Sequence, residues 1–218
     1  EQYAKEGVFT VNGRLEGTQL TTKLHVRVSA QTEKGANISD QWTGSELPLA
    51  FASDSNPTDP VSNVNDKLIS FNDRPANRWT NWNRSNPEAS VGSGILSKRS
   101  VDNLSVGFHE DHGVGAPKSY VIEYYVGKTV PTAPKNPSFV GNEEHVFNDP
   151  ANWKEVSNLK APAQLKAGEM NHFSFDKVET YAVRIRMVRA DDKLGTSITE
   201  VQIFSKQVAP AKHCLLYT

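Results

Sequence analysis

The sequence has few of the features that fix many small folds or direct a protein to a charged partner. Its 218 residues include one cysteine, Cys214, which excludes an internal disulfide and a zinc cluster built on cysteines. With 24 Lys and Arg against 25 Asp and Glu, the net charge of −1 gives no reason to expect a nucleic-acid partner or insertion into a membrane. No apolar run approaches the roughly 20 residues that a membrane-spanning helix needs. The length predicts one domain, or one domain with an appendage, that is large enough to bury a core.

Amphipathic helix patterns are also scarce, whereas strand patterns are plentiful. No stretch of about eleven residues has apolar side chains at i, i+3, i+4 and i+7 without Gly, Pro or strict alternation. Apolar and polar residues alternate in five short segments, at 24–28, 104–108, 120–125, 183–187 and 198–204. Short alternating strands between turn residues predict an all-β protein whose antiparallel sheets pack as a sandwich.

Four long polar segments separate these strands. They span residues 53–67, 72–90, 109–118 and 128–150. Each is far longer than the two to six residues that usually connect elements of a compact domain. Long loops on a rigid scaffold are where binding groups are commonly found, so we expect the functional residues in these segments.

The two ends of the chain differ from its middle. Residues 7–29 contain enough alternation for two or three strands of their own, and a polar segment follows them. The chain starts with Glu1 and shows no signal-peptide pattern, so we interpret it as a piece of a larger protein. We predict N-terminal strands at 1–30, the main β-sandwich at 31–206, and a linker or non-native tail at 207–218.

Several motifs in a fixed order give a more specific indication. They occupy residues 65–82, 101–108, 111–125, 152–156 and 198–204. This order resembles the discoidin, or coagulation-factor type C, superfamily of galactose-binding-like β-sandwiches. It is most similar to the family 71 carbohydrate-binding module of streptococcal surface β-galactosidases, over residues from about 40 to 206. Residues 7–29 resemble the end of a bacterial immunoglobulin-like domain. One departure is that 91–96 is short and glycine-rich where the family has a substantial apolar strand.

The resemblance implies a jelly-roll sandwich without catalytic activity. Modules of that family hold terminal β-galactose, as in lactose or N-acetyllactosamine, next to the active site of the parent enzyme, and they can help a bacterium adhere to host glycans. We therefore expect a secreted parent protein anchored at the bacterial cell wall. The expected partners are galactose-terminated glycans and the rest of the parent chain, with the isolated module a monomer.

Two tryptophans lie in the segment 79–84, which combines aromatic and polar side chains. A sugar site needs an aromatic ring to stack on the apolar C–H face of a pyranose and planar polar groups to bind its hydroxyls. Trp79 and Trp82 point to opposite sides of an extended segment because their separation is odd. The resemblance implies that the first is buried, which makes Trp82 the predicted platform, with Asn81 and Arg84 beside it. The alternative is that both rings pack internally, as tryptophan usually does.

A second polar cluster follows the strand at 104–108. The resemblance implies that this loop and an earlier one bind sugar hydroxyls. The implied ligands are His109, Glu110, Asp111 and, more weakly, Asp54. Two alternatives stay open, an ordinary solvated turn and a zinc site that includes His112. The zinc alternative has no helix to align its histidines and no third ligand nearby in sequence.

A calcium ion is common in this superfamily, near the first turn of the sandwich. Calcium takes six to eight oxygen ligands, which carboxylates and loop carbonyls supply. The resemblance places Asp66 and Glu200 at that site, with Asp73 as a substitute. Lys67 stands where the usual pattern has Gly, which counts against the site. A bound Ca²⁺ would hold loop ends together and take no part in chemistry.

The sequence thus predicts a binding module and not an enzyme. A glycoside hydrolase needs two carboxyl groups about 5 to 9.5 Å apart across a cleft, whereas Glu110 and Asp111 are neighbours on one loop. The alternative function is a discoidin-like protein-interaction or adhesion module without sugar binding. Membrane-binding versions carry apolar residues at their loop tips, and the loops here are rich in Asn, Asp, Ser and Pro.

Overall fold

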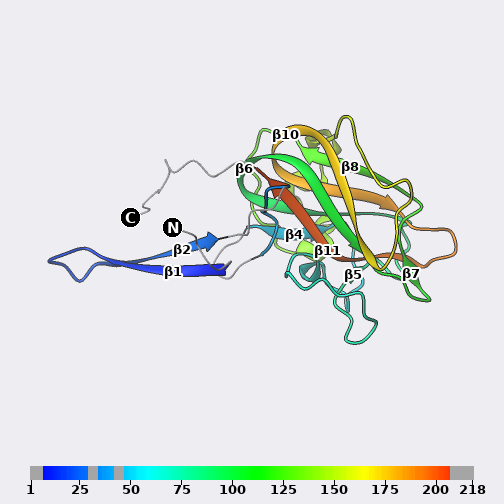
Figure 1. Cartoon of the computed structure of the whole chain (residues 1–218), viewed down its shortest axis with the longest axis horizontal. Helices are drawn as coiled ribbons and strands as arrows, with labels where there is room; N and C mark the ends of the chain where they lie inside the picture. Colours follow the sequence, from blue (N-terminus) through cyan, green and yellow to red (C-terminus); the bar gives the residue numbers. More distant parts are fainter. Residues whose placement is uncertain (1–6, 29–33, 42–46, 207–218) are drawn as a thin grey trace.

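A computed structural model describes residues 7–28, 34–41 and 47–206 of the chain. It shows a β-sandwich from which a long hairpin projects (Figure 1). The strands are β1 (Gly7–Arg14), β2 (Thr21–Val28), β3 (Ala36–Asn37), β4 (Leu49–Ala52), β5 (Trp79–Thr80), β6 (Glu88–Phe108), β7 (Val114–Gly115), β8 (Ser119–Tyr125), β9 (Trp153–Glu155), β10 (Glu169–Val188) and β11 (Gly195–Ser205). Short 3₁₀ turns lie between them, namely η1 (Val61–Val64), η2 (Pro137–Asn142), η3 (Val146–Asn148) and η4 (Pro150–Asn152). Among the described residues, no helix is long and apolar enough to cross a membrane.

Strands β6 and β10 pair with each other along most of their length and run through both layers of the sandwich. The first part of β6 pairs with β4, and its second part pairs with β11. The second part of β10 pairs with β8, which in turn pairs with β9. Register shifts in β10, between Ser174 and Val178 and between Thr180 and Ala182, mark where the sheet bends from one layer to the other. The predicted antiparallel sandwich is confirmed.

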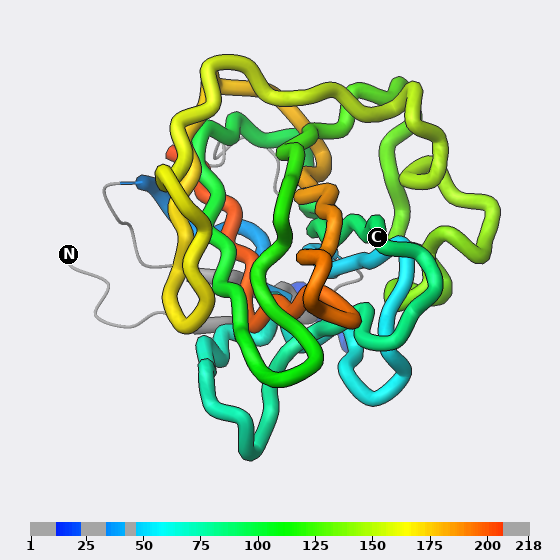
Figure 2. Tube along the Cα trace, turned by 90° about the vertical axis from the view of Figure 1, so that its right-hand side faces the viewer, coloured from blue at the N-terminus to red at the C-terminus, as the bar shows by residue number. Residues whose placement is uncertain are grey.

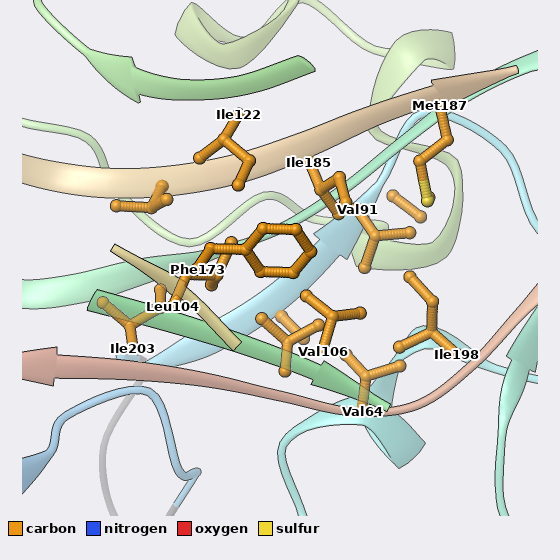
Figure 3. Close-up of a cluster of buried hydrophobic side chains, with 14 of the residues drawn as sticks. Val64, Val91, Leu104, Val106, Ile122, Phe173, Ile185, Met187, Ile198 and Ile203 are labelled. Atoms are coloured by element: carbon orange, nitrogen blue, oxygen red, sulfur yellow. The ribbon is translucent and has the colours of Figure 1, made fainter. Parts of the chain in front are cut away.

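The core lies between the two layers and follows the alternation that the sequence shows. In β10, Val183, Ile185 and Met187 are almost completely buried, whereas Arg184 and Arg186 lie on the opposite face. Figure 3 shows Ile185 and Met187 facing apolar side chains from β6 and β11. Burying these side chains supplies the main stabilisation of the sandwich, about 25 cal/mol for each Å² of apolar surface removed from water.

A second, aromatic cluster covers the outer face of the layer formed by β4, β6, β10 and β8. It consists of Phe51, Tyr125, Val140, Phe147, Trp153 and Ala182. The Phe51 and Phe147 rings stack with their centroids 4.1 Å apart. The predicted loop 128–150 is therefore not a free polar loop, because η2 and η3 pack its apolar residues onto the sheet.

The glycine-rich segment 91–96 is part of one continuous strand, β6, and not a short irregular stretch. A Cβ atom on Gly92 would lie 2.5 Å from the Val183 carbonyl oxygen and 2.7 Å from the Phe51 ring. Glycine at this position lets the aromatic cluster lie directly on the sheet. The predicted loop 72–90 also needs correction, since it contains β5 and the start of β6.

The projecting hairpin confirms the strands expected at the start of the chain. β1 and β2 pair antiparallel from Gly7 opposite Val28 to Arg14 opposite Thr21. Within the described part of the chain, these two strands pair only with each other (Figure 1). The proposed division at 1–30, 31–206 and 207–218 stays a prediction, and the last segment lies outside the described residues.

Candidate carbohydrate-binding site

Three segments meet at one end of the sandwich and form the candidate site. They are the segment after β5, the 109–113 loop after β6, and the turn between β10 and β11. In Figure 2 the 109–113 loop (green) and the 189–195 turn (orange) lie side by side facing the viewer. The backbone N–H of Leu194 donates to the Gly113 carbonyl at 2.9 Å, and that of Asn83 donates to the Leu194 carbonyl at 3.2 Å. These hydrogen bonds fix the three segments to one another.

The two tryptophans of the site have opposite environments. Trp79 is completely buried, and its indole N–H donates to the Ser55 hydroxyl at 2.8 Å. Its predicted place in the core is confirmed. Trp82 is 43% exposed at the loop end. A Cβ atom on Gly113 would lie 2.6 Å from Trp82 Nε1, so only glycine lets the 109–113 loop support the edge of this ring.

Asn81 and Arg84 flank Trp82 in sequence but differ in what they can reach. Asn81 is buried, and its side-chain oxygen accepts a hydrogen bond from the Thr196 backbone N–H at 2.7 Å. It therefore positions the platform segment and has no surface for a ligand. Arg84 is partly exposed and pairs with the Asp54 carboxylate at 3.0 Å. Its guanidinium also lies over the Phe139 ring, 5.6 Å from the centroid.

The 109–113 loop is ordered by its own polar side chains. His109 is buried, and its Nε2 lies 3.0 Å from the Asp73 carboxylate, outside hydrogen-bond alignment. Glu110 is exposed and pairs with Lys193 at 3.1 Å. Of the three sugar ligands predicted in this loop, only Glu110 is exposed; His112, the candidate of the zinc alternative, is exposed as well.

Asp111 is engaged within the protein on both carboxylate oxygens. One accepts from the backbone N–H groups of Gly113 at 2.8 Å and Val114 at 3.1 Å, and the other lies 2.8 Å from the Arg78 guanidinium. Burial alone would raise the pKa of Asp111, but these hydrogen bonds and the arginine charge outweigh it and lower the pKa. Asp111 thus holds the loop that supports Trp82.

The predicted calcium residues are only partly brought together. Glu200 is completely buried, and neither carboxylate oxygen makes a well-aligned hydrogen bond, although the Lys67 backbone N–H faces the group and partly offsets the rise in its pKa. Burial, with the nearby charges of Asp40 and Asp66, raises the pKa of Glu200 to about 9. Asp73 lies with His109 instead. The Lys67 ammonium is 3.7 Å from the Asp40 carboxylate and supplies positive charge there.

A cation would meet the need of this buried carboxylate, and loop backbone is at hand to complete a coordination shell. Lys67 has a left-handed backbone with φ of 74°, a conformation that glycine adopts most easily. Among residues 7–28, 34–41 and 47–206, however, no group of three or more His, Cys, Asp and Glu side chains is arranged to hold a metal ion. The orphaned Glu200 oxygens fit a bound Ca²⁺, and the remaining ligands would have to be largely carbonyl oxygens.

Three contributors to the site were not predicted from sequence. Leu194 is 51% exposed and lies beside the Trp82 segment, Lys193 pairs with Glu110, and Arg78 pairs with Asp111. The polar run Asp191-Asp192-Lys193 between two strands is a turn signal that could have drawn attention to the first two.

The site as a whole has an exposed indole, an exposed leucine on the adjoining turn, and charged groups on the neighbouring segments. Such a surface can stack one face of a pyranose and bind hydroxyls at its rim.

Comparison with known proteins defines the class. Residues 50–201 match the model of the family described as "Beta-galactosidase-like, Galactose-binding domain". The chain belongs to this family, which is a non-catalytic carbohydrate-binding module within a larger enzyme chain. The particular likeness is to a solved structure from the Streptococcus pneumoniae β-galactosidase BgaA, at 89% sequence identity and a TM-score of 0.77, covering 79% of this chain and 99% of that one. The predicted family is thereby confirmed, although the number 71 stays a prediction.

More distant structures share the fold alone. Chitosan-binding module 1 from a Paenibacillus sp. IK-5 chitosanase/glucanase has 15% identity and a TM-score of 0.51, covering 78% of this chain and 98% of that one. A fucose binding module of Streptococcus pneumoniae has 10% identity and a TM-score of 0.51, covering 80% of this chain and 98% of that one. The comparison with curated proteins gives no match.

Proposed function

We propose that this module binds terminal β-galactose, as in lactose or N-acetyllactosamine, with Trp82 as the stacking platform. The observation that carries the proposal is the exposed indole, which is 43% accessible and is held by the Gly113 loop at the end of a rigid sandwich. Glu110 and Arg84 are the exposed polar groups beside it, while Asp54 orients Arg84. His109, Asp111 and Asn81 support the loops from within.

The biological role that we infer is to keep a parent β-galactosidase on galactose-terminated glycans at the bacterial surface. The 89% identity to a structure from the streptococcal enzyme BgaA supports such a parent and an extracellular location. One sugar offers one stacking face and a few hydroxyls, so we expect a dissociation constant between about 1 mM and about 50 µM. Retention on a surface would then depend on several modules acting together.

We also propose that Ca²⁺ binds at Glu200 and is structural. The support is a buried carboxylate that makes no well-aligned hydrogen bond and lies near the charges of Asp40 and Asp66. The ion would neutralise this group and hold the first loop of the sandwich to β11. It would contact none of the predicted sugar ligands.

The decisive experiment is lactose titration of the Trp82→Ala variant by calorimetry. Loss of the stacking face should reduce lactose binding below detection, because the remaining polar contacts compete with water. The melting temperature should stay close to that of the parent, because the ring is half exposed and packs little of the core. Leu96→Ala is the matched control, since it removes an apolar side chain that is 59% exposed on β6. Unchanged lactose affinity in Trp82→Ala would contradict the proposed platform.

The alternative is a protein-interaction or adhesion module without sugar binding. A glycan array separates the two. Binding confined to galactose-terminated glycans is expected, and silence across all glycans by a folded module would favour the alternative.

A further inference from the structure

A second concave surface lies on the outer face of the sheet. It is a cavity of about 500 Å³, between the sheet and the segment that contains η2 and η3. This volume is in the range of small-molecule sites. Its polar lining comes from three neighbouring strands, with Glu88 and Ser90 on β6, Arg184 and Arg186 on β10, and Glu123 on β8. None of these residues belongs to the site already described.

The charged side chains of this cavity form an inner and an outer pair. Arg184 and Glu123 are the inner pair, with Nε and Oε2 2.7 Å apart and side chains only 12% and 11% exposed. The Arg184 guanidinium also lies 4.1 Å from the centroid of the Trp153 ring. Arg186 and Glu88 form the outer pair, with side chains 36% and 47% exposed. The inner pair is therefore fixed by packing, and the outer pair faces the opening.

The outer pair is only loosely made. Arg186 donates hydrogen bonds to Glu88 at 3.3 Å and to Glu123 at 3.4 Å, both at the long end of the range for such contacts. The exposed Arg186–Glu88 pair contributes little to stability, on the order of 0 to 1 kcal/mol. A ligand can replace that contact at little cost.

The charge balance indicates what kind of ligand fits. Two arginines and two glutamates cancel, so a phosphate or carboxylate would meet the glutamates and a cation would meet the arginines. A neutral polyol avoids both conflicts, because adjacent hydroxyls can accept from a guanidinium and donate to a carboxylate at once. Ala89, Val140 and Pro150 supply apolar lining for the C–H groups of a ring.

We propose that this cavity is a second saccharide-binding site, specific for neutral hexoses and independent of the Trp82 platform. The two surfaces share no side chain. They adjoin through Arg84, which lies over Phe139 next to Val140 of the cavity wall. The module would then contact two sugar units with separate chemistries, one by stacking and one by paired hydrogen bonds.

The test is nuclear magnetic resonance of the whole chain carrying Trp82→Ala, which removes the first platform. Galactose, glucose and lactose are added separately, up to about 100 mM, because single-sugar affinities lie near the millimolar range. At least one should shift the backbone amide signals of residues 86–90, 140–148 and 184–186. Absence of these shifts for all three sugars would overturn the proposal, as would shifts there with inorganic phosphate alone.

A second variant ties the shifts to the charged pair. Arg186→Met should weaken the sugar affinity that these shifts report about tenfold, which is the effect of losing one charge-assisted hydrogen bond. Lys154→Met is the matched control, because it removes an exposed cation from β9, and it should leave them unchanged. If Arg186→Met unfolds the module, Glu88→Gln removes charge from the outer pair while keeping its shape and should give the same weakening. Full retention of the shifts in a folded variant of either kind would contradict the proposed ligands. Lactose titration of Arg186→Met with Trp82 intact tests the first site separately.

Discussion

Asp111 and Glu200 are two carboxyl groups that the fold treats in opposite ways. Asp111 receives two backbone N–H groups and an arginine, and its pKa is lowered. Glu200 is more deeply buried, makes no well-aligned hydrogen bond and has only the Lys67 backbone N–H facing it, and its pKa is raised to about 9. The Asp111 carboxylate is fully paired within the protein, whereas the Glu200 carboxylate holds a proton or needs a cation.

This difference separates two roles of acidic residues, shaping a loop and binding a ligand, which sequence motifs do not distinguish. An aspartate whose oxygens are all engaged shapes a loop, and here that loop supports the exposed Trp82. A buried glutamate without an aligned partner is costly when charged, so it either keeps its proton or is neutralised by a cation. The following predictions test this contrast.

The largest expected effect is a pH dependence of stability that arises from Glu200. Its pKa rises from 4.5 to about 9 on folding, so the folded chain keeps a proton that the unfolded chain releases. With chelator present, the contribution of Glu200 to the free energy of unfolding should be fully present below about pH 4.5. It should fall as the pH rises toward 9, by up to about 1.4 kcal/mol per pH unit. Urea denaturation across this range measures the slope.

The control for that slope is Glu200→Gln, which cannot ionise and should abolish it. The loss of stability that remains in acid should then include Asp111, whose lowered pKa stabilises the fold above its ordinary pKa and is lost as the pH falls through the folded value. A parent protein whose stability rises steadily from pH 5 to pH 9 in chelator would contradict the raised pKa.

Calcium should give the next largest effect. Saturating a site that exists only in the folded chain contributes about 2.7 kcal/mol at one hundred times the dissociation constant. For a domain of this size that corresponds to a rise of about 5 to 10 °C in melting temperature. Calorimetric melting with Ca²⁺ and with chelator measures it at pH 7, and Glu200→Gln should show no such rise. Equal melting temperatures of the parent under both conditions would exclude the proposed ion.

The smallest effect on stability is expected in the 109–113 loop, where the Asp111 carboxylate is already fully paired. Asp111→Asn keeps an oxygen for the backbone N–H groups but loses the charge that pairs with Arg78, so it should destabilise the fold by about 1 to 2 kcal/mol. Glu110→Gln removes only an exposed pair with Lys193 and should cost about 0.5 kcal/mol. Urea midpoints compare the two variants, and a larger loss in Glu110→Gln would reverse the roles assigned here.

Much of the scaffold follows from local patterns in the sequence. The alternation at 183–187 correctly separates core from surface, because a strand turns successive side chains to opposite faces. Trp79 is buried and Trp82 exposed, as predicted, but β5 ends at Thr80 and Trp82 lies in the turn that follows, so strand alternation is not the reason. The pattern at 183–187 succeeds because it depends on the geometry of a single strand.

The rest depends on partners that are distant in the sequence. Gly92 looks like a turn residue in the sequence, yet it lies within β6. Phe51 and Val183, from two other strands, approach it too closely for a side chain. Asn81 was predicted to bind sugar, but its side-chain oxygen accepts a hydrogen bond from the Thr196 backbone N–H. No local pattern carries this information, since it arises only when the β10–β11 turn is placed against the platform segment.

The passage of β6 and β10 through both layers has a mechanical consequence. Each layer is hydrogen-bonded to strands that continue into the other, so pulling on the loop end loads both layers together and cannot peel one away. If sugar binds at Trp82 as proposed, that weak contact would release before the strands separate, and the protein would stay folded and able to bind again.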